Sequence, residues 1–156
     1  MTPGRRTLSY QDFDAINADV ERLLQGCSTV GTWSLGQICD HLATVTERAL
    51  NLPPDGPHDT SLRVPDEKRA EVFATGRLPE GIPLPAALTP PTEVDAAQAA
   101  GRLRRALAAM GEATGPLAPH RLFGPLEMDQ WRRLVCIHCA HHLSFAVPSG
   151  GEGDAS

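Results

Sequence analysis

The sequence has few aromatic residues and no long uninterrupted run of apolar ones. Phenylalanine, tryptophan and tyrosine together make up 4% of the 156 residues, whereas apolar residues as a whole make up 41%. A core built mainly from alanine and leucine is more typical of packed helices than of a β-sandwich. No apolar run approaches the roughly 18 to 20 residues that a helix needs to cross a bilayer. We therefore expect a helical protein without membrane-spanning segments.

Positive charge is also scarce, and it is not clustered. Lysine and arginine total 14 against 19 aspartate and glutamate residues, which gives a formal net charge of -5. Because both signs are interspersed, there is no basic face for nucleic acid and no polybasic run for an anionic membrane. Arg5 and Arg6 are followed by polar and acidic residues where an export signal requires an apolar segment. Without a membrane span or an export signal, the protein is expected to be cytoplasmic. We expect a small-molecule substrate, with a homodimer as an alternative to a monomer.

The number of cysteines does not suggest a disulfide-bonded scaffold. A chain of this length buries roughly 70% of its unfolded surface, so it needs neither disulfides nor a metal in order to fold. The four cysteines are expected to be reduced thiols. We expect one domain over residues 1–148, followed by a glycine- and acid-rich tail at 149–156 that is flexible.

Four stretches with helical periodicity are separated by connections rich in proline and glycine. Ser34 and Gln37 have the spacing of a capping box, which marks the start of the second helix, and the proline pair at 53–54 ends it. The four helices are expected at residues 9–24, 34–52, 92–112 and 127–145. Because no stretch alternates convincingly as a strand does, the pattern predicts an all-α four-helix bundle.

The connector between the second and third helices, residues 51–91, is unusually long and contains more than half of the 14 prolines. A short helix is expected within it at about 66–75. A connector of this length in a compact domain is typically functional or crosses the bundle from end to end. We expect it to shape the entrance to a pocket.

Two cysteines and three histidines fall within seven residues at 136–142, CIHCAHH. His138 and His142 interrupt the apolar stripe of the fourth helix. Positions i and i+4 lie about 40° apart around a helix and about 6 Å apart along it, so two imidazoles there can converge on one metal ion. His141 is expected at the edge of the bundle, because it projects in another direction.

His41 lies on the inward face of the second helix, between Ile38 and Val45. It could complete a three-histidine site inside the bundle, which is where such folds place metals. Three protein nitrogens leave a position for water or substrate, as in catalytic zinc sites. The alternative is a set of core histidines that hydrogen-bond to their neighbours, and spacing alone favours neither interpretation.

The same segment could also be interpreted as a redox, haem or peptidase site, but the sequence supports these interpretations less well. Cys136-x-x-Cys139 has redox spacing, but no preceding strand suggests a thioredoxin-like unit. A c-type haem site requires histidine directly after the second cysteine, where Ala140 stands. The H-E-x-x-H motif of metallopeptidases is excluded, because Cys139 occupies the position of its glutamate. Both thiols are expected to act as small hydrophobic residues.

Four parts of the sequence carry a family resemblance: GTWSLGQICDHLA at 31–43, PHRLFGPL at 119–126, Trp131, and HCAHHLSFAVP at 138–148. Together they resemble the DinB/YfiT-like metalloenzyme superfamily. The closest likeness is to a bacterial branch with the patterns W-S-L-G-Q-I-C-D-H-L-A and H-x-x-H-H-L, and the opening RRTLSY fits it too. His120 stands where that branch has a histidine, but Arg121 replaces the proline that follows there.

The resemblance implies a four-helix bundle that binds a divalent metal, zinc or nickel, through one histidine of the second helix and two of the fourth. Matched by motif, these are His41, His138 and His142. Members of the superfamily include S-transferases and isomerases that use a low-molecular-weight thiol, so a metal-dependent transferase or hydrolase is expected. A non-catalytic helical bundle that binds a small molecule or dimerises around a structural metal is the alternative.

Four residues near these histidines also have expected roles. Gln37 and Asp40 are candidates to orient a metal-ligating ring, since such rings commonly donate their second N–H to a neighbouring group. Asp40 projects about 100° away from the ligand next to it, which favours a contact between helices. Trp33 and Trp131 are expected to be packing residues.

Overall fold

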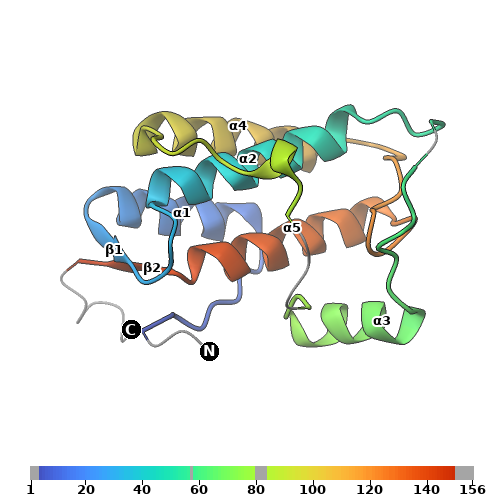
Figure 1. The fold of residues 1–156 in the computed structure, drawn as a ribbon, viewed down its shortest axis with the longest axis horizontal. Coiled ribbons are helices and arrows are strands. Elements are labelled where there is room, and N and C mark those ends of the chain that lie inside the picture. Colours follow the sequence, from blue (N-terminus) through green and yellow to red (C-terminus); the bar gives the residue numbers. More distant parts are fainter. Residues whose placement is uncertain (1–3, 57, 80–83, 150–156) are drawn as a thin grey trace.

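The computed structural model describes residues 4–56, 58–79 and 84–149. Within these residues the chain forms five α-helices, one short 3-10 helix and two short strands (Figure 1). In chain order they are α1 Phe13–Leu24, β1 Cys27–Thr29, α2 Leu35–Asn51, α3 Asp66–Thr75, η1 Ala86–Leu88, α4 Ala96–Glu112, α5 Met128–Leu143 and β2 Ala146–Pro148. The expected helical class is confirmed.

The capping residues explain where the helices begin. The Ser34 hydroxyl accepts the backbone N–H of Gln37 at 3.2 Å, and the Gln37 side chain accepts the N–H of Ser34 at 2.9 Å, which confirms the predicted capping box. The third of the predicted helices starts later than expected. Asp95 accepts the N–H of Gln98 and is therefore the cap, so α4 begins at Ala96 and not at residue 92.

Two other predicted boundaries were wrong for similar reasons. α1 begins at Phe13 and not at residue 9, because the Asp12 carboxylate accepts the N–H of Ala15 and caps it. α5 ends at Leu143, two residues before the predicted end, because the chain turns there into β2.

β2 pairs antiparallel with β1, with Ser28 opposite Val147. Strands of three residues are too short to show alternation in the sequence.

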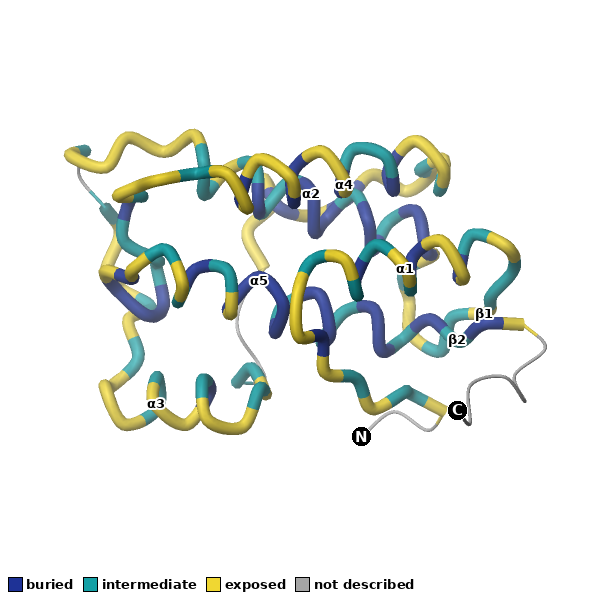
Figure 2. Tube along the Cα trace, turned by 180° about the vertical axis from the view of Figure 1, so that it is seen from behind, coloured by how far each residue is buried: buried dark blue, intermediate teal, exposed yellow. Residues whose placement is uncertain are grey.

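Four of the helices contact one another. α2 packs against α4 and α5, and α1 packs against the same two helices. The short helix α3, at the predicted residues, lies apart from α1, α2 and α4 (Figure 1) and is largely exposed (Figure 2). Buried residues concentrate along α2 and α5, which are the two helices that carry the candidate histidines (Figure 2).

The Ser149 N–H donates to the Gly26 carbonyl at 2.8 Å, and residues 150–156 of the expected flexible tail lie outside the described residues. Among the described helices, none has both the length and the apolar character that a bilayer crossing requires.

Candidate metal centre and adjoining cavity

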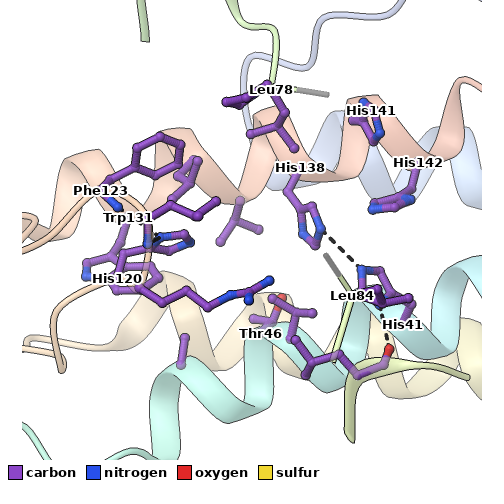
Figure 3. A pocket seen from close by; sticks show the side chains of 18 of the residues that line it. His41, Thr46, Leu78, Leu84, His120, Phe123, Trp131, His138, His141 and His142 are labelled. Atoms are coloured by element: carbon purple, nitrogen blue, oxygen red, sulfur yellow. Dashed lines mark hydrogen bonds between the residues drawn. The ribbon is translucent and has the colours of Figure 1, made fainter. Parts of the chain in front are cut away.

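The three histidines selected from the sequence lie together. His41 comes from the middle of α2, and His138 and His142 lie one turn apart near the end of α5 (Figure 3). One nitrogen from each ring lies within 4.8 Å of the other two. The Nε2 atoms of His41 and His138 are 3.3 Å apart. The cluster could therefore hold a metal ion.

The orientation of the His41 ring is fixed by a backbone group. Its Nδ1 lies 2.8 Å from the carbonyl oxygen of Leu88, in η1. A carbonyl oxygen only accepts hydrogen bonds, so Nδ1 carries the proton and Nε2 has a free lone pair. The lone pair is directed toward His138. This is the arrangement by which metal-ligating histidines are usually held.

The separation of the His41 and His138 nitrogens matches tetrahedral coordination. Zinc–nitrogen bonds are about 2.0–2.1 Å long, so two ligands at a tetrahedral angle place their nitrogens about 3.3–3.4 Å apart. The 3.3 Å between His41 and His138 falls in this range. Two lone pairs at this distance repel unless a proton or a cation lies between them. The donor set therefore fits a divalent ion of this type.

Burial favours the neutral form of the three rings. His41 is only 2% exposed. Loss of hydration is the main reason why its pKa is lowered, and it also lowers the pKa of His138 and His142 well below that of a free histidine. The proximity of the rings to one another adds to the effect at His138 and His142. Neutral imidazole is the form that binds metal.

Trp33 lies against the cluster, which the sequence did not suggest. Its ring stacks on that of His142, with centroids 5.6 Å apart and 21° between the planes, and its centroid is 5.1 Å from that of His41. The expectation of a mere packing residue was therefore incomplete. Its place directly before the capping residue Ser34 could have drawn attention to it, but no sequence pattern indicates the direction of its ring.

The two side chains suggested as hydrogen-bond partners of the ligands have other partners. Gln37 caps α2 and donates its amide to the Pro91 carbonyl at 2.9 Å. Asp40 pairs with Arg102 of α4 at 2.8 Å, which agrees with the expected contact between helices. The partner of His41 is instead the carbonyl of Leu88, in the connector.

His141 belongs to a neighbouring group rather than to the cluster. Its Nδ1 lies 3.0 Å from an Arg5 guanidinium nitrogen, and Arg5 also donates to the His141 carbonyl at 3.2 Å. The same guanidinium lies over the Phe145 ring at 4.3 Å. Since a guanidinium only donates, His141 accepts through Nδ1. Arg5 thus ties the N-terminal segment to the end of α5.

The histidines open into a cavity of about 420 Å³. Leu78, Pro79, Leu84 and Leu88 of the long connector contribute to its wall, as expected of that segment. Figure 3 shows the cluster at one end of the cavity, and His120, Phe123 and Trp131 at the other.

His120 has a defined role in the wall of this second end. Its Nδ1 accepts the backbone N–H of Leu122 at 3.0 Å and that of Phe123 at 3.4 Å. The proton of the neutral ring is therefore on Nε2. Burial, with help from the adjacent Arg121 charge, lowers the pKa of His120 to about 4. Trp131 is buried as predicted, but it also forms part of the cavity wall.

The cysteines of CIHCAHH take no part in the site. Cys136 and Cys139 are buried, their thiols are free, and neither lines the cavity. Burial raises the pKa of Cys136 to about 11 and raises that of Cys139 further above its ordinary value. Thiols of this kind are poor nucleophiles and poor metal ligands at neutral pH. Their interpretation as small hydrophobic residues is confirmed.

Fold and site together define a helical protein with a candidate three-histidine metal centre at one end of a small cavity. The family model described as "Protein of unknown function (DUF1569)" matches residues 3–149, and the chain belongs to this family. Searches of curated proteins and of solved structures find no match to the chain.

Proposed function

We propose that the protein is a metal-dependent enzyme with a four-helix bundle of the DinB-like type, in which α1, α2, α4 and α5 form the bundle. His41, His138 and His142 hold a divalent ion, zinc or nickel. The substrate is a small molecule, and a low-molecular-weight thiol serves as co-substrate in an S-transfer reaction. The observation that carries the proposal is the convergence of three neutral imidazoles at the end of a cavity.

The residues around the cluster prepare it for such a role. The carbonyl of Leu88 holds the Nε2 lone pair of His41 toward the centre. Trp33 covers the His142 ring and restricts its orientation. A bound divalent ion lowers the pKa of a thiol or water among its ligands and so makes a nucleophile available at neutral pH. Apolar side chains, Val45 and Leu134 among them, line the cavity beside the histidines.

The metal content of protein purified without a histidine tag tests the proposal. We expect about one equivalent of zinc or nickel in the wild type, and a loss of tenfold or more in His138→Ala, as is usual when a ligand of a three-residue site is removed. His58→Ala is the matched control. This ring lies in the connector, where its Nε2 contacts the Pro54 carbonyl, and it is outside the cluster. Wild-type protein that contains less than about a tenth of an equivalent of any divalent metal would contradict the proposal.

A second function is favoured by one feature of the cavity. None of the described residues that line the cavity is aspartate or glutamate, so these residues supply no carboxylate that could act as a general base. The protein could then be a binding module in which the metal is structural. Thermal unfolding with and without a chelator separates the two functions, because a structural ion stabilises the fold by its binding free energy. A large drop in melting temperature, together with no thiol-transfer activity in the metal-loaded protein, would favour the binding module.

A further inference from the structure

The described residues that line the cavity include cationic side chains but no anionic one. Two arginines and five histidines line it, and no described lining residue is acidic. A cavity lined by positive charge without a neighbouring carboxylate is suited to a ligand that carries negative charge.

The two arginines differ in their partners. Arg5 is occupied by His141, Ser144 and the Phe145 ring. Arg121 also lines the cavity, yet within the described part of the chain its guanidinium has no hydrogen bond and no ion pair. It is half-buried. A guanidinium offers five donors in a planar fork that matches the two oxygens of a carboxylate, which makes Arg121 a candidate to bind an oxyanion.

Two other donors lie beside Arg121. His120, the preceding residue, has its proton on Nε2, because its Nδ1 accepts two backbone N–H groups. Trp131 is 5% exposed, lines the cavity, and its buried Nε1–H has no partner in the described structure. A buried N–H without an acceptor is unusual in a folded protein and calls for an explanation, for which an acceptor bound in the adjoining cavity is one candidate. Figure 3 places His120 and Trp131 together, at the end of the cavity away from His41 and His142.

We propose that this end of the cavity, the anion pocket of His120, Arg121 and Trp131, binds the carboxylate of a small organic acid. The apolar body of the acid then lies along Leu134 and Val135, toward the histidine cluster. A cavity of about 420 Å³ is within the usual size range for such ligands. The position of the apolar part of the acid, beside the metal centre, rests on the proposed function. Binding of the carboxylate at the anion pocket requires no metal.

The pocket can be tested with phenylacetate and hexanoate as probes and with phenylacetamide as the neutral counterpart. Binding is followed by calorimetry and by tryptophan fluorescence, on metal-free and on zinc-loaded protein. We expect saturable binding of both acids and at least tenfold weaker binding of the amide. Arg121→Met is expected to weaken binding of the acids by about 10- to 100-fold, the usual effect of losing hydrogen bonds to a charged group, and to leave amide binding unchanged.

Two further variants make the result specific. Arg105→Met is the matched control, because Arg105 is an exposed arginine of α4 outside the cavity. The Arg105→Met protein should bind the acids as tightly as the wild type does. Arg121→Lys keeps the charge but loses the planar fork, so an intermediate loss is expected. If circular dichroism shows that Arg121→Met does not fold, the affinity of Arg121→Lys for the acids is compared with that of the wild type instead.

The outcomes separate the anion pocket from the metal centre. Arg121-dependent binding of the acids to a protein that takes up no metal would support the pocket and contradict the proposed function. Binding that requires zinc and is unchanged in Arg121→Met would overturn the pocket, because the metal would then hold the carboxylate. Absence of saturable binding in both forms, up to on the order of 10 mM probe, would also overturn it.

Discussion

The Nδ1–H of His41 donates to the carbonyl oxygen of Leu88 across 47 residues of sequence, at 2.8 Å. The bond joins the middle of α2 to the end of the proline-rich connector. It determines which nitrogen of His41 is free to bind a metal, since a ring that donates through Nδ1 has its lone pair on Nε2. The connector therefore takes part in the site and is more than a link between helices.

The protonated nitrogen of each ring can be observed directly. In metal-free protein at neutral pH, we expect His41 as the Nδ1–H tautomer, and His120 as the Nε2–H tautomer, because its Nδ1 accepts from Leu122 and Phe123. Long-range proton–nitrogen NMR spectra distinguish the two forms. His58, whose Nε2 contacts the Pro54 carbonyl, serves as a reference outside the site. A proton on Nε2 of His41 would show that this atom is not prepared for a metal.

His120 should make the stability of the metal-free protein depend on pH. Burial lowers its pKa from 6.5 to about 4 in the folded state. Between these values the unfolded chain takes up a proton that the folded protein does not, so the free energy of unfolding decreases as the pH falls below 6.5 and is unaffected above it. The decrease from this residue is up to about 3 kcal/mol.

Urea unfolding of wild type and His120→Asn measures this contribution. Asparagine offers an oxygen that can accept the same backbone N–H groups but has no proton to gain. We expect the two proteins to differ in pH dependence only below the pKa of free histidine, where the wild type loses stability faster. The other buried histidines are common to both proteins and do not contribute to the difference. Parallel pH curves would mean that His120 is not neutral and buried.

Much of the fold and of the site was predictable because it depends on local patterns. The capping box of Ser34 and Gln37 marks the start of α2 through the chemistry of two side chains. His138 and His142 were identified by their i, i+4 spacing, and His41 by its place on the inward face of a periodic segment. In each case the side chains themselves carry the information.

The features that escaped prediction depend on tertiary contacts or on the backbone. The partner of His41 is a main-chain carbonyl at Leu88, and every residue has such a group, so no residue type marks it. The stacking of Trp33 on His142 brings together residues from two distant segments. The pairing of β1 with β2 involves three residues on each side, which is too few for a periodic signal.

The close approach of α2 to the segment before α4 depends on the glycine at position 36. A Cβ there would collide with the backbone carbonyl oxygen of Val94 and lie 3.3 Å from the Ala96 nitrogen. Backbone atoms cannot move aside as a flexible side chain can, so Gly36→Ala is expected to lower the free energy of unfolding by about 1–3 kcal/mol. Chemical denaturation provides the measurement.

Gly101→Ala is the matched control for that substitution. Gly101 lies within α4, and an added Cβ would meet only the end of the flexible Arg105 side chain, at 3.6 Å. Alanine is the better helix former, so this variant should be more stable than wild type by about 0.5–1 kcal/mol. Opposite signs for the two glycines would establish that the Gly36 effect comes from packing. Equal effects would contradict the close approach seen in the structure.

The cysteines and histidines of CIHCAHH are expected to respond differently to substitution. Cys136 and Cys139 fill space in the core, whereas His142 offers a nitrogen to the cluster. Cys136→Ala and Cys139→Ala should each lower the free energy of unfolding by about 1 kcal/mol, because a small void replaces a buried sulfur atom. Their metal content should equal that of the wild type, while His142→Ala loses the metal. If either cysteine variant loses metal without unfolding, the thiol is a ligand and the three-histidine assignment is wrong.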